Sequence, residues 1–270
     1  MIVVKVGGRA LEANLDNILK SLARHFKLGK KIVFVHGGGD IVSRYERMMG
    51  LEPKFITSPS GIRSRYTDEK ELDVYVMVMA GKLNKEIVAK LHALGVKAIG
   101  FSGADGGLLK AIRKRKLIII DERGRKRIIE GGYTGSIKEV NIELLEKTLD
   151  LGYLAVVSPI AIGFEHELLN VDADQVASAI ATTAKAEKLL ILTDVDGLIL
   201  DGELVRELHV DEFEEIKGKI GAGMNRKVML CVKAVKNGVG SAIISSGLIE
   251  DPLLALEDGR GTRILPRPLR

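Results

Sequence analysis

Runs rich in valine and isoleucine alternate along the chain with longer amphipathic segments. Each run has the length of a buried strand, and the segment after the first run has Leu15, Ile18 and Leu22 on one helical face before Gly29 ends it. The predicted strands are 2–6, 31–36, 97–102, 153–162, 188–193 and 241–247. The predicted helices are 15–29, a segment that ends near 50, 68–95 with a break near Gly81, 139–152, 172–186 and 226–239.

Three stretches depart from this alternation. Residues 51–67 contain two prolines and Gly61 and are expected to form a loop. In residues 111–129, two β-rich runs flank the turn-like "DERGR", which predicts a hairpin. The tail 264–270 contains two prolines and is expected to be irregular.

The alternation predicts an α/β fold with a largely parallel sheet that helices cover on both faces. Parallel strands are joined by right-handed crossovers, and these are usually helical. Ligands of such sheets bind beyond the carboxyl ends of the strands. The loops that follow the strands are therefore where we expect the chemistry.

Composition narrows the class of protein. Of 270 residues 46% are hydrophobic, enough for one large domain or two closely joined lobes. No apolar run is long enough to span a bilayer, and the N-terminus lacks the layout of a signal peptide. Cys231 is the only cysteine, which excludes an internal disulfide and a cysteine-based zinc cluster. We therefore expect a cytoplasmic protein.

The positive charge of the chain is concentrated in the predicted hairpin. The chain has 41 basic and 36 acidic residues, but residues 111–129 hold eight of the basic ones against Asp121 and Glu122. The remainder is nearly neutral, with 33 basic and 34 acidic residues. The hairpin could dock an acidic partner, could be merely solvated, or could bind nucleic acid. The absence of interleaved aromatic residues for base stacking argues against nucleic acid.

Glycine clusters follow the first two predicted strands. "KVGG" places Lys5 just before Gly7 and Gly8, and "HGGGD" follows the second strand. Glycine lets backbone N–H groups approach an anion, and a helix N-terminus adds a favourable dipole. A lysine in an apolar strand needs a polar site or a partner, because burial of an unpaired ammonium is costly. The pattern suits phosphoryl transfer, although a tight turn alone would explain "HGGG".

Other signatures are missing or ambiguous. The sequence has no Walker motif and no Gly-x-Gly-x-x-Gly at the first helix, which argues against P-loop enzymes and nicotinamide dehydrogenases. His36 precedes the second glycine cluster and is either a catalytic base or a structural histidine.

Eight motifs, in this order and spacing, resemble the amino acid kinase family, most closely its N-acetylglutamate kinase branch. The motifs span nearly the whole chain. They are "VVKVGG" (3–8), "VHGGGD" (35–40), "RYTD" (65–68), "GFSGADGG" (100–107), "GGYTGSIKEVN" (131–141), "NVDADQVASAIA" (170–181), "LLILTDVDG" (189–197) and "GMNRKV" (223–228).

The resemblance implies a three-layer αβα sandwich on a mainly parallel sheet of about eight strands. It implies one domain, 1–270, in which lobe 1–170, with the basic hairpin 110–130, binds an acyl acceptor and lobe 171–270 binds ATP with Mg²⁺. The implied reaction moves the γ-phosphoryl group to a side-chain carboxylate and gives an acyl phosphate. The magnesium ion would have no direct protein ligand.

The resemblance also assigns three catalytic residues. Lys5 and Lys227 would stabilise the charge on the moving phosphoryl group, and Asp174 would hold both lysines in place. No proton base is needed, because a carboxylate is ionised at neutral pH. Each of two residues also has a simpler explanation. Asp174 could be only a negative charge near the N-terminal end of a helix dipole, and Lys227 could be only part of a solvated helix face.

Further residues are implied to bind the two substrates. Arg65 would grip an α-carboxylate through its planar fork, and Asn170 would hydrogen-bond the substrate amide. The residues implied on the acceptor side are Gly8, Gly38, Gly39, Arg65 and Asn170. Those implied at the nucleotide are Thr193, Asp194 and Gly197.

The substrate loop "SPSGIRSRYTD" (58–68) is two residues longer than the usual acetylglutamate kinase pattern. It resembles the subgroup that phosphorylates aminoadipate or glutamate attached to an acidic amino-group carrier protein. There the carrier's C-terminal glutamate holds the substrate through an isopeptide bond, and lysine, or in some organisms arginine or ornithine, is made on the carrier. Because of the longer loop Arg63 is a second candidate for the carboxylate ligand, and Arg65 is our prediction.

In this interpretation the basic hairpin docks the carrier. Complementary charge raises the encounter rate and orients the partner more than it adds affinity. The candidate docking residues are Lys110, Arg113, Lys114, Arg115, Lys116, Arg123, Arg125, Lys126 and Arg127.

Two other functions stay open: an N-acetylglutamate kinase of arginine synthesis, and a non-catalytic sensor of nucleotide and amino acid. The presence of Lys5, Asp174 and Lys227 together argues against a sensor.

Glutamate and aminoadipate differ by one methylene, worth about 1–3 kcal/mol in a pocket, so one protein can use both. The resemblance implies a homodimer. Because the first predicted strand begins at residue 2, we expect no extra N-terminal helix like that of hexameric, arginine-regulated relatives.

Overall fold

An eight-stranded sheet forms the middle of the computed structural model, which describes residues 1–267. The strand order is β16-β18-β17-β13-β1-β2-β10-β5, and only β17 and β18 pair antiparallel. The strands are β1 (Ile2–Val6), β2 (Ile32–His36), β5 (Ala98–Ser102), β10 (Leu154–Ser158), β13 (Lys188–Thr193), β16 (Glu207–His209), β17 (Ser241–Ser246) and β18 (Thr262–Leu265). The predicted, mainly parallel sheet of about eight strands is confirmed.

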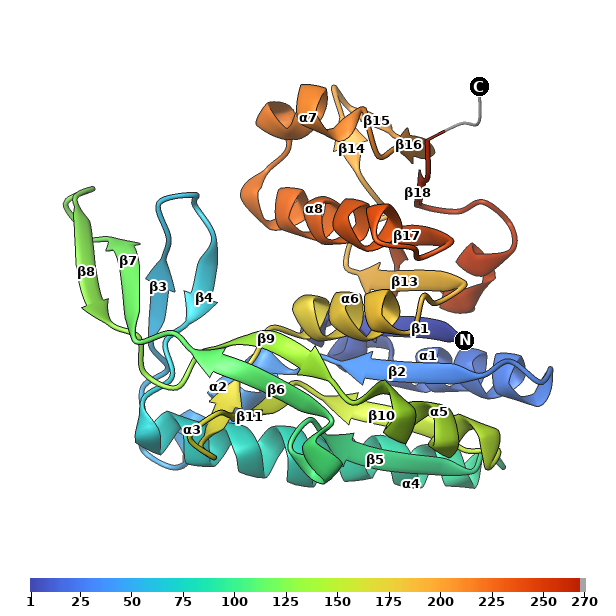
Figure 1. Cartoon of the computed structure of the whole chain (residues 1–270), viewed down its shortest axis with the longest axis horizontal. Coiled ribbons are helices and arrows are strands. Elements are labelled where there is room, and N and C mark those ends of the chain that lie inside the picture. Colours follow the sequence, from blue (N-terminus) through green and yellow to red (C-terminus); the bar gives the residue numbers. More distant parts are fainter. Residues whose placement is uncertain (268–270) are drawn as a thin grey trace.

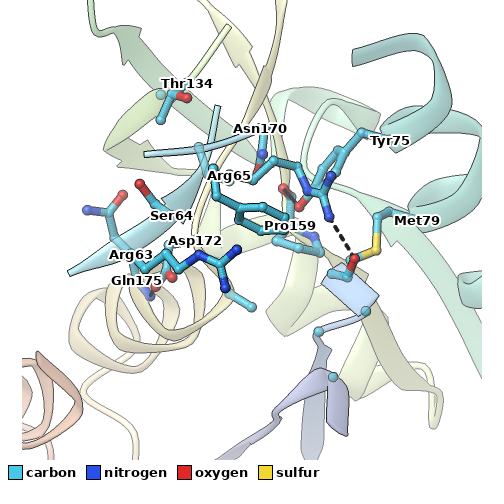
Figure 2. Close-up of a pocket in the computed structure, with 18 of the residues that line it drawn as sticks. Arg63, Ser64, Arg65, Tyr75, Met79, Thr134, Pro159, Asn170, Asp172 and Gln175 are labelled. Carbon is cyan, nitrogen blue, oxygen red and sulfur yellow. Dashed lines mark hydrogen bonds between the residues drawn. The ribbon is translucent and has the colours of Figure 1, made fainter. Parts of the chain in front are cut away.

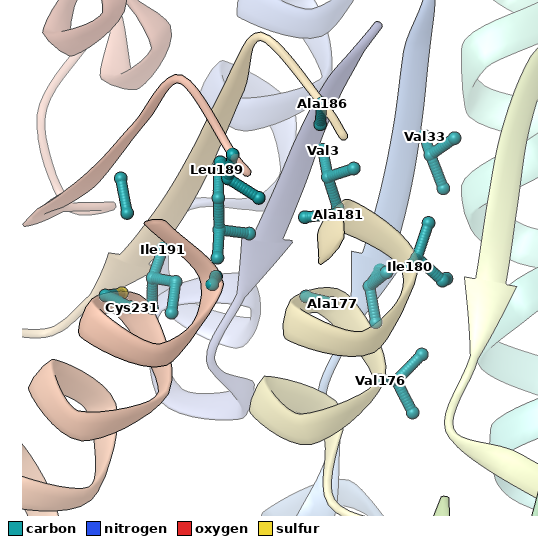
Figure 3. Close-up of a cluster of buried hydrophobic side chains, with 14 of the residues drawn as sticks. Val3, Val33, Val176, Ala177, Ile180, Ala181, Ala186, Leu189, Ile191 and Cys231 are labelled. Carbon is teal, nitrogen blue, oxygen red and sulfur yellow. The ribbon is translucent and has the colours of Figure 1, made fainter. Parts of the chain in front are cut away.

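Helices cover both faces of this sheet, so the predicted three-layer sandwich is confirmed (Figure 1). Side chains alternate along β1, so that Val4 and Val6 pack toward one helical layer and Val3 toward the other. Figure 3 shows Val3 of β1 close to Ala181 of α6, in the hydrophobic core between the sheet and the second helical layer. The first layer holds α1 (Gly8–Lys27), α2 (Gly39–Met48), α3 (Glu69–Val76) and α4 (Asn84–Ala93); the second holds α5 (Ile142–Asp150), α6 (Ala173–Thr183) and α8 (Ala222–Lys236).

The predicted helix 68–95 is confirmed, but the break expected near Gly81 is wrong, because the helix continues there with a changed winding. Between α3 and α4, Met77–Leu83 form a π-helical segment. This segment presses Met79 and Leu83 against the second glycine loop: a Cβ on Gly38 would lie 2.6 Å from Leu83 Cδ2 and 2.9 Å from Met79 Sδ. π-Helical turns are frequent at functional sites, and this one shapes a loop at the carboxyl edge of the sheet.

The predicted strand 153–162 is wrong in one respect, because it is two strands in two sheets. Proline has no backbone N–H and cannot continue a ladder, so the chain leaves the main sheet at Pro159. It then joins a smaller sheet of order β12-β11-β6-β9. The strands of this sheet are β6 (Leu109–Arg113), β9 (Gly135–Val140), β11 (Ile160–Gly163) and β12 (Leu168–Asn170).

Two hairpins stand next to each other away from the main sheet (Figure 1). The predicted basic hairpin is confirmed for β7 (Lys116–Ile120) with β8 (Lys126–Glu130). Lys110 and Arg113 of the predicted range belong instead to β6 of the smaller sheet. The loop predicted for residues 51–67 is wrong in part, because β3 (Phe55–Thr57) pairs with β4 (Arg63–Arg65). Alternation is hard to recognise in strands of only three residues, so the sequence pattern missed this pair.

The remaining elements are short. The predicted irregular tail is wrong for Ile264 and Leu265, which belong to β18, while residues 268–270 lie outside the described residues. The short elements are 3₁₀ turns at Asp105–Gly107, Lys217–Lys219 and Pro252–Leu256, α7 (Phe213–Ile216), β14 (Ile199–Leu200) and β15 (Glu203–Leu204).

Candidate active site

Lys5 is the polar exception in the buried strand β1. Alternation places its side chain on the same face as Val3, toward α6 and α8. Only 6% of this side chain is exposed, so its ammonium group needs an anion close by. Asp174, in the first turn of α6, provides the anion, with 2.6 Å between Lys5 Nζ and Asp174 Oδ1.

Asp174 joins a second lysine to the first. Its other carboxylate oxygen, Oδ2, accepts a hydrogen bond from Lys227 Nζ of α8 at 2.5 Å. The structure thus brings together the three residues that the resemblance implied to act together. Two ammonium groups share one carboxylate, so the cluster has one positive charge in excess, which suits an incoming anion.

Burial and pairing act in opposite directions on these groups. Burial raises the pKa of Asp174, but both lysines outweigh burial and hold that pKa below its ordinary value, so the carboxylate is ionised. Burial lowers the pKa of Lys227, but attraction to Asp174 prevails and the pKa is raised. For Lys5 burial prevails over Asp174, and Lys227 adds repulsion, so the pKa is lowered. Lys5 therefore gains most from a further negative charge.

Two glycine loops meet beside this cluster. A Cβ on Gly37 would lie 2.9 Å from the backbone N of Gly8, and one on Gly8 would lie 3.1 Å from the backbone N of Gly38. Larger residues would push the loops apart. Because α1 begins at Gly8 and α2 at Gly39, the free N–H groups and dipoles of two helices lie side by side.

Two cavities meet at these loops. The first, here the arginine cavity, has a volume of about 350 Å³ and is lined by Arg63, Arg65 and the glycine loops (Figure 2). The second, the lysine cavity, has about 460 Å³ and is lined by the Lys5–Asp174–Lys227 cluster. Gly8 and Asp172 line both cavities, so a group at their junction can be approached from either side.

The lysine cavity also contains two of the residues implied to bind nucleotide. Thr193 and Asp194 line it at the end of β13, and Asp194 accepts a hydrogen bond from Arg9 Nη1 at 2.8 Å. Gly197 is not among its lining residues. A Cβ there would lie 2.7 Å from Thr262 Oγ1, so close packing against β18 accounts for this glycine. Sequence reasoning missed Arg9, which directly follows "KVGG".

The two candidate arginines of the arginine cavity have different surroundings. Arg65 is buried, and its guanidinium donates to Glu46 and to Ser43 Oγ. It also donates to the Gly39 carbonyl at 2.8 Å (Figure 2). Arg63 is exposed and lies over the Phe55 ring, 4.2 Å from its centroid. Arg65 therefore anchors β4 to α2, and Arg63 has the less engaged guanidinium.

Glu46 is a partner of Arg65 that sequence reasoning missed. Its side chain is fully buried on α2, and burial raises the pKa of Glu46 while the charge of Arg65 opposes the rise. The signal was available: helical spacing places Glu46 on the same face as Val42 and Ser43, which are also buried.

The start of α6 forms another wall of the arginine cavity. Asn170 lines it and donates from Nδ2 to Thr67 Oγ1 at 2.8 Å. Asp172 caps α6 by accepting from the Gln175 N–H, and its Oδ1 lies 3.3 Å from Arg226 Nη2. Asp172 and Arg226 were missed, although each stands within two residues of a predicted catalytic residue.

The basic residues of the hairpin divide into paired and free groups. Asp121 organises the turn and pairs with Arg125 and Arg127. The Arg113 guanidinium lies 4.0 Å from the centre of the Tyr133 ring. Arg115 pairs with Glu165, which lies between β11 and β12 of the smaller sheet. Lys110 of β6 is also paired, with Nζ 3.7 Å from Glu139 Oε2. Within residues 1–267, the basic residues of this region without a carboxylate partner include Lys114, Lys116, Arg123 and Lys126.

His36 is fully buried and lines neither cavity. Its Nδ1 donates to the Gly37 carbonyl at 3.3 Å, and Nε2 accepts from Asn84 Nδ2 at 3.3 Å. Burial lowers the pKa of His36 to about 4, so the imidazole is neutral near pH 7. This geometry favours the structural interpretation over the catalytic base.

Metal ligands and membrane segments were sought in the same part of the chain. Across residues 1–267, no three His, Cys, Asp or Glu side chains are grouped so that they could hold a metal ion. None of the helices described for this range combines the length and apolar character that a membrane crossing requires.

Comparison with known proteins gives consistent matches. Residues 1–246 match the model of the amino acid kinase family. A protein of Metallosphaera sedula named "[LysW]-aminoadipate/[LysW]-glutamate kinase" is 50% identical over 98% of this chain and 100% of its own length. A Sulfolobus acidocaldarius protein of the same name is 49% identical with the same coverage.

Solved structures with low identity share the fold. An N-acetylglutamate synthase of Neisseria gonorrhoeae, complexed with coenzyme A and N-acetyl-glutamate, has a TM-score of 0.82 at 24% identity. The match covers 99% of this chain, which spans 60% of that structure's chain. A Giardia lamblia carbamate kinase bound to AMP-PNP has a TM-score of 0.71 at 16% identity, and the match covers 98% of both chains.

The Arg65→Met variant is expected to lose about 3 kcal/mol of unfolding free energy, because it leaves Glu46 buried without its ion pair. Urea unfolding at pH 7 measures this loss. The double variant Arg65→Met/Glu46→Leu should regain most of it, and the exposed control Arg63→Met should change by less than about 1 kcal/mol. Wild-type stability of the single variant would contradict the anchoring role.

Proposed function

This chain belongs to the amino acid kinase family, and on that premise we propose that it phosphorylates aminoadipate, glutamate or both while they are linked to an acidic carrier protein. The γ-phosphoryl group of ATP goes to the side-chain carboxylate and gives an acyl phosphate. With aminoadipate as acceptor this is a step of lysine synthesis, and with glutamate it is a step of arginine synthesis. Two relatives that carry the [LysW]-linked kinase name match over nearly the full chain at about half identity.

One observation carries the proposal: two lysines and one aspartate line the lysine cavity, which meets the arginine cavity at Gly8 and Asp172. In the transition state the transferred phosphoryl group spreads its charge over three oxygens. Fixed cations stabilise this charge distribution more than they stabilise the ground state. Lys5 and Lys227 are the catalytic cations of this proposal. Asp174 is a positioning residue that holds both ammonium groups and keeps them charged.

The lysine cavity is the proposed nucleotide site. Thr193 and Asp194 form its wall, and the N-terminus of α1 offers free N–H groups to phosphate oxygens. Magnesium usually binds through substrate phosphates with few protein carboxylates. Asp194 lines this cavity and already accepts a hydrogen bond from Arg9, so the phosphates of ATP would be the main ligands of the magnesium ion. Gly197 would support the site through packing.

The arginine cavity is the proposed acceptor site. The backbone of Gly8, Gly38 and Gly39 would face the reacting carboxylate, and Asn170 would hydrogen-bond the amide that joins substrate to carrier. The exposed guanidinium of Arg63 is better placed for an α-carboxylate than Arg65, which already has three partners. We therefore propose Arg63 as the main ligand and Arg65 as the anchor of the hairpin that carries it.

The basic hairpin is the proposed docking surface for the carrier. Ile118 and Ile128 pair across the hairpin, are more than half exposed, and lie on the same face as Lys116 and Lys126. A hairpin that is merely solvated needs no exposed apolar pair. The free cations together with this apolar pair are what an interface with an acidic protein surface requires. The paired residues Arg113, Arg115, Arg125 and Arg127 would hold the hairpin in shape.

The division into lobes is also part of the proposal. Lobe 1–170 supplies β1, β2, β5 and β10 to the main sheet, and lobe 171–270 supplies the other four strands, so that one continuous sheet supports both substrate sites. A homodimer, which the family resemblance implies, is the proposed assembly, and the cytoplasm, which the composition favours, is its proposed location.

The Lys5→Met and Lys227→Met variants are each expected to lower kcat by about 10²-fold or more, because one transition-state cation is missing. The measurement is ATP consumption in the presence of saturating carrier-linked aminoadipate. The exposed Lys31→Met serves as the control, and its kcat should equal that of the wild type. Unchanged turnover in either test variant would remove that lysine from the proposed chemistry.

A substrate comparison tests the acceptor class directly. We expect phosphorylation of carrier-linked aminoadipate or glutamate with a kcat/KM that falls steeply as salt rises from about 0.05 to 0.5 M, because screening weakens docking. A Lys116→Met/Lys126→Met variant should lose most of this salt dependence. If free N-acetylglutamate is phosphorylated faster than both carrier-linked acids, the protein is an N-acetylglutamate kinase and the proposal is wrong.

A further inference from the structure

Two cations on the wall of the arginine cavity have no role in the phosphoryl transfer or in the acceptor binding proposed so far. Lys114 comes from the base of the basic hairpin, between β6 and β7, and Arg226 comes from α8, one residue before Lys227. The two residues lie on opposite lobes and line the same cavity. Their convergence is therefore a product of the fold, not of sequence proximity.

Defined contacts hold the side chain of Arg226 and the backbone of Lys114. Arg226 is 24% exposed, and its Nη2 lies 3.3 Å from Oδ1 of Asp172, which is itself fixed as the cap of α6. The Lys114 N–H donates to the Thr134 carbonyl at 2.8 Å, and the Lys114 carbonyl lies so close to Gly131 that a Cβ there has no space. The base of the hairpin is thus a firm support for Lys114.

The charges around this pair do not balance. The carboxylates that line the cavity are Asp40 and Asp172. Asp172 pairs with Arg226 and also caps α6, and within residues 1–267 it forms no ion pair with Lys114. Burial lowers the pKa of Lys114, and the charge of Arg226 lowers it further, while Asp172 only partly compensates. A second anion between the two cations would relieve this repulsion.

The proposed acceptor offers such an anion. An amino acid linked through its α-amino group to the side chain of a glutamate has two free carboxylates besides the one that is phosphorylated. One is its own α-carboxylate, for which Arg63 is the proposed ligand. The other is the α-carboxylate of the linking glutamate, which an N-acetylated acid lacks.

We propose that Lys114 and Arg226 form a subsite for the carboxylate of the carrier residue to which the substrate is linked. This inference rests on the proposed function. The subsite selects a carrier-linked acceptor over an N-acetyl acid by its charge, close to the reacting group and separate from docking on the outer face of the hairpin. Arg226 also connects this recognition to α8, the helix that supplies Lys227.

The test compares two synthetic acceptors, measured by calorimetry in the absence of nucleotide. In the first, the amino group of aminoadipate is acylated by the side chain of glutamate; in the second, the glutamate α-carboxylate is a carboxamide. We expect the wild type to bind the carboxylate form about tenfold more tightly or better, as befits charge-assisted hydrogen bonds. Lys114→Met and Arg226→Met should each reduce this preference to about threefold or less, and Arg226→Lys should restore part of it.

The readout is a ratio for one protein sample, so a general loss of affinity or stability does not change it. Lys138→Met, at an exposed position outside the cavity, is the matched control and should keep the wild-type ratio. The same ratio in wild type and test variants, or no preference in the wild type, including no detectable binding of either acceptor, would overturn the inference. Turnover of the intact carrier-linked acid is assayed separately. If that turnover is found without a preference, only the subsite is wrong; if it is not found, the proposed function itself fails.

Discussion

A carboxylate shared by two lysine ammonium groups is the constraint on which this site depends. Asp174 is within 2.6 Å of Lys5 and Lys227, and all three side chains are largely withdrawn from water. Such a cluster adds little to the free energy of unfolding, because the desolvation of three charges costs about as much as their mutual attraction contributes. Its surplus positive charge has a use only when an anion enters, and the neighbouring cavities provide the space for one.

The fold brings these charges together through simple geometry. Alternation along β1 directs Lys5 toward the helical layer of α6 and α8, and both helices begin at the carboxyl edge of the sheet. On the opposite side of the junction, close glycine loops start α1 and α2. The hairpins then enclose the arginine cavity, and Gly61 at the tip of β3–β4 faces Ala222 at the start of α8. Elements from both halves of the chain are therefore needed for either substrate site.

The sequence predicted the parts of this arrangement that depend on period and composition. Buried runs identified β1 and β2, and Gly81 marked the position of an irregularity between α3 and α4, although this is a changed winding and not a break. The resemblance links Lys5, Asp174 and Lys227, and in the structure Asp174 contacts both lysines. A shared motif order carries such information across the chain, which local patterns cannot.

What the sequence did not predict depends on tertiary contacts. The change of sheet at Pro159 and the short pairing of β3 with β4 are decided by neighbouring strands, not by local alternation. The buried partner of Arg65 lies in a different element, so nothing near the arginine indicates that its guanidinium is already engaged.

The most direct test of the central claim is a crystal structure with ADP, magnesium, aluminium fluoride and an acceptor acid. We expect a planar aluminium fluoride group at the junction of the two cavities, with Nζ of Lys5 and Nζ of Lys227 each roughly 3 Å from a fluoride. A fluoride group that contacts neither ammonium, while both remain bound to Asp174 alone, would contradict the central claim.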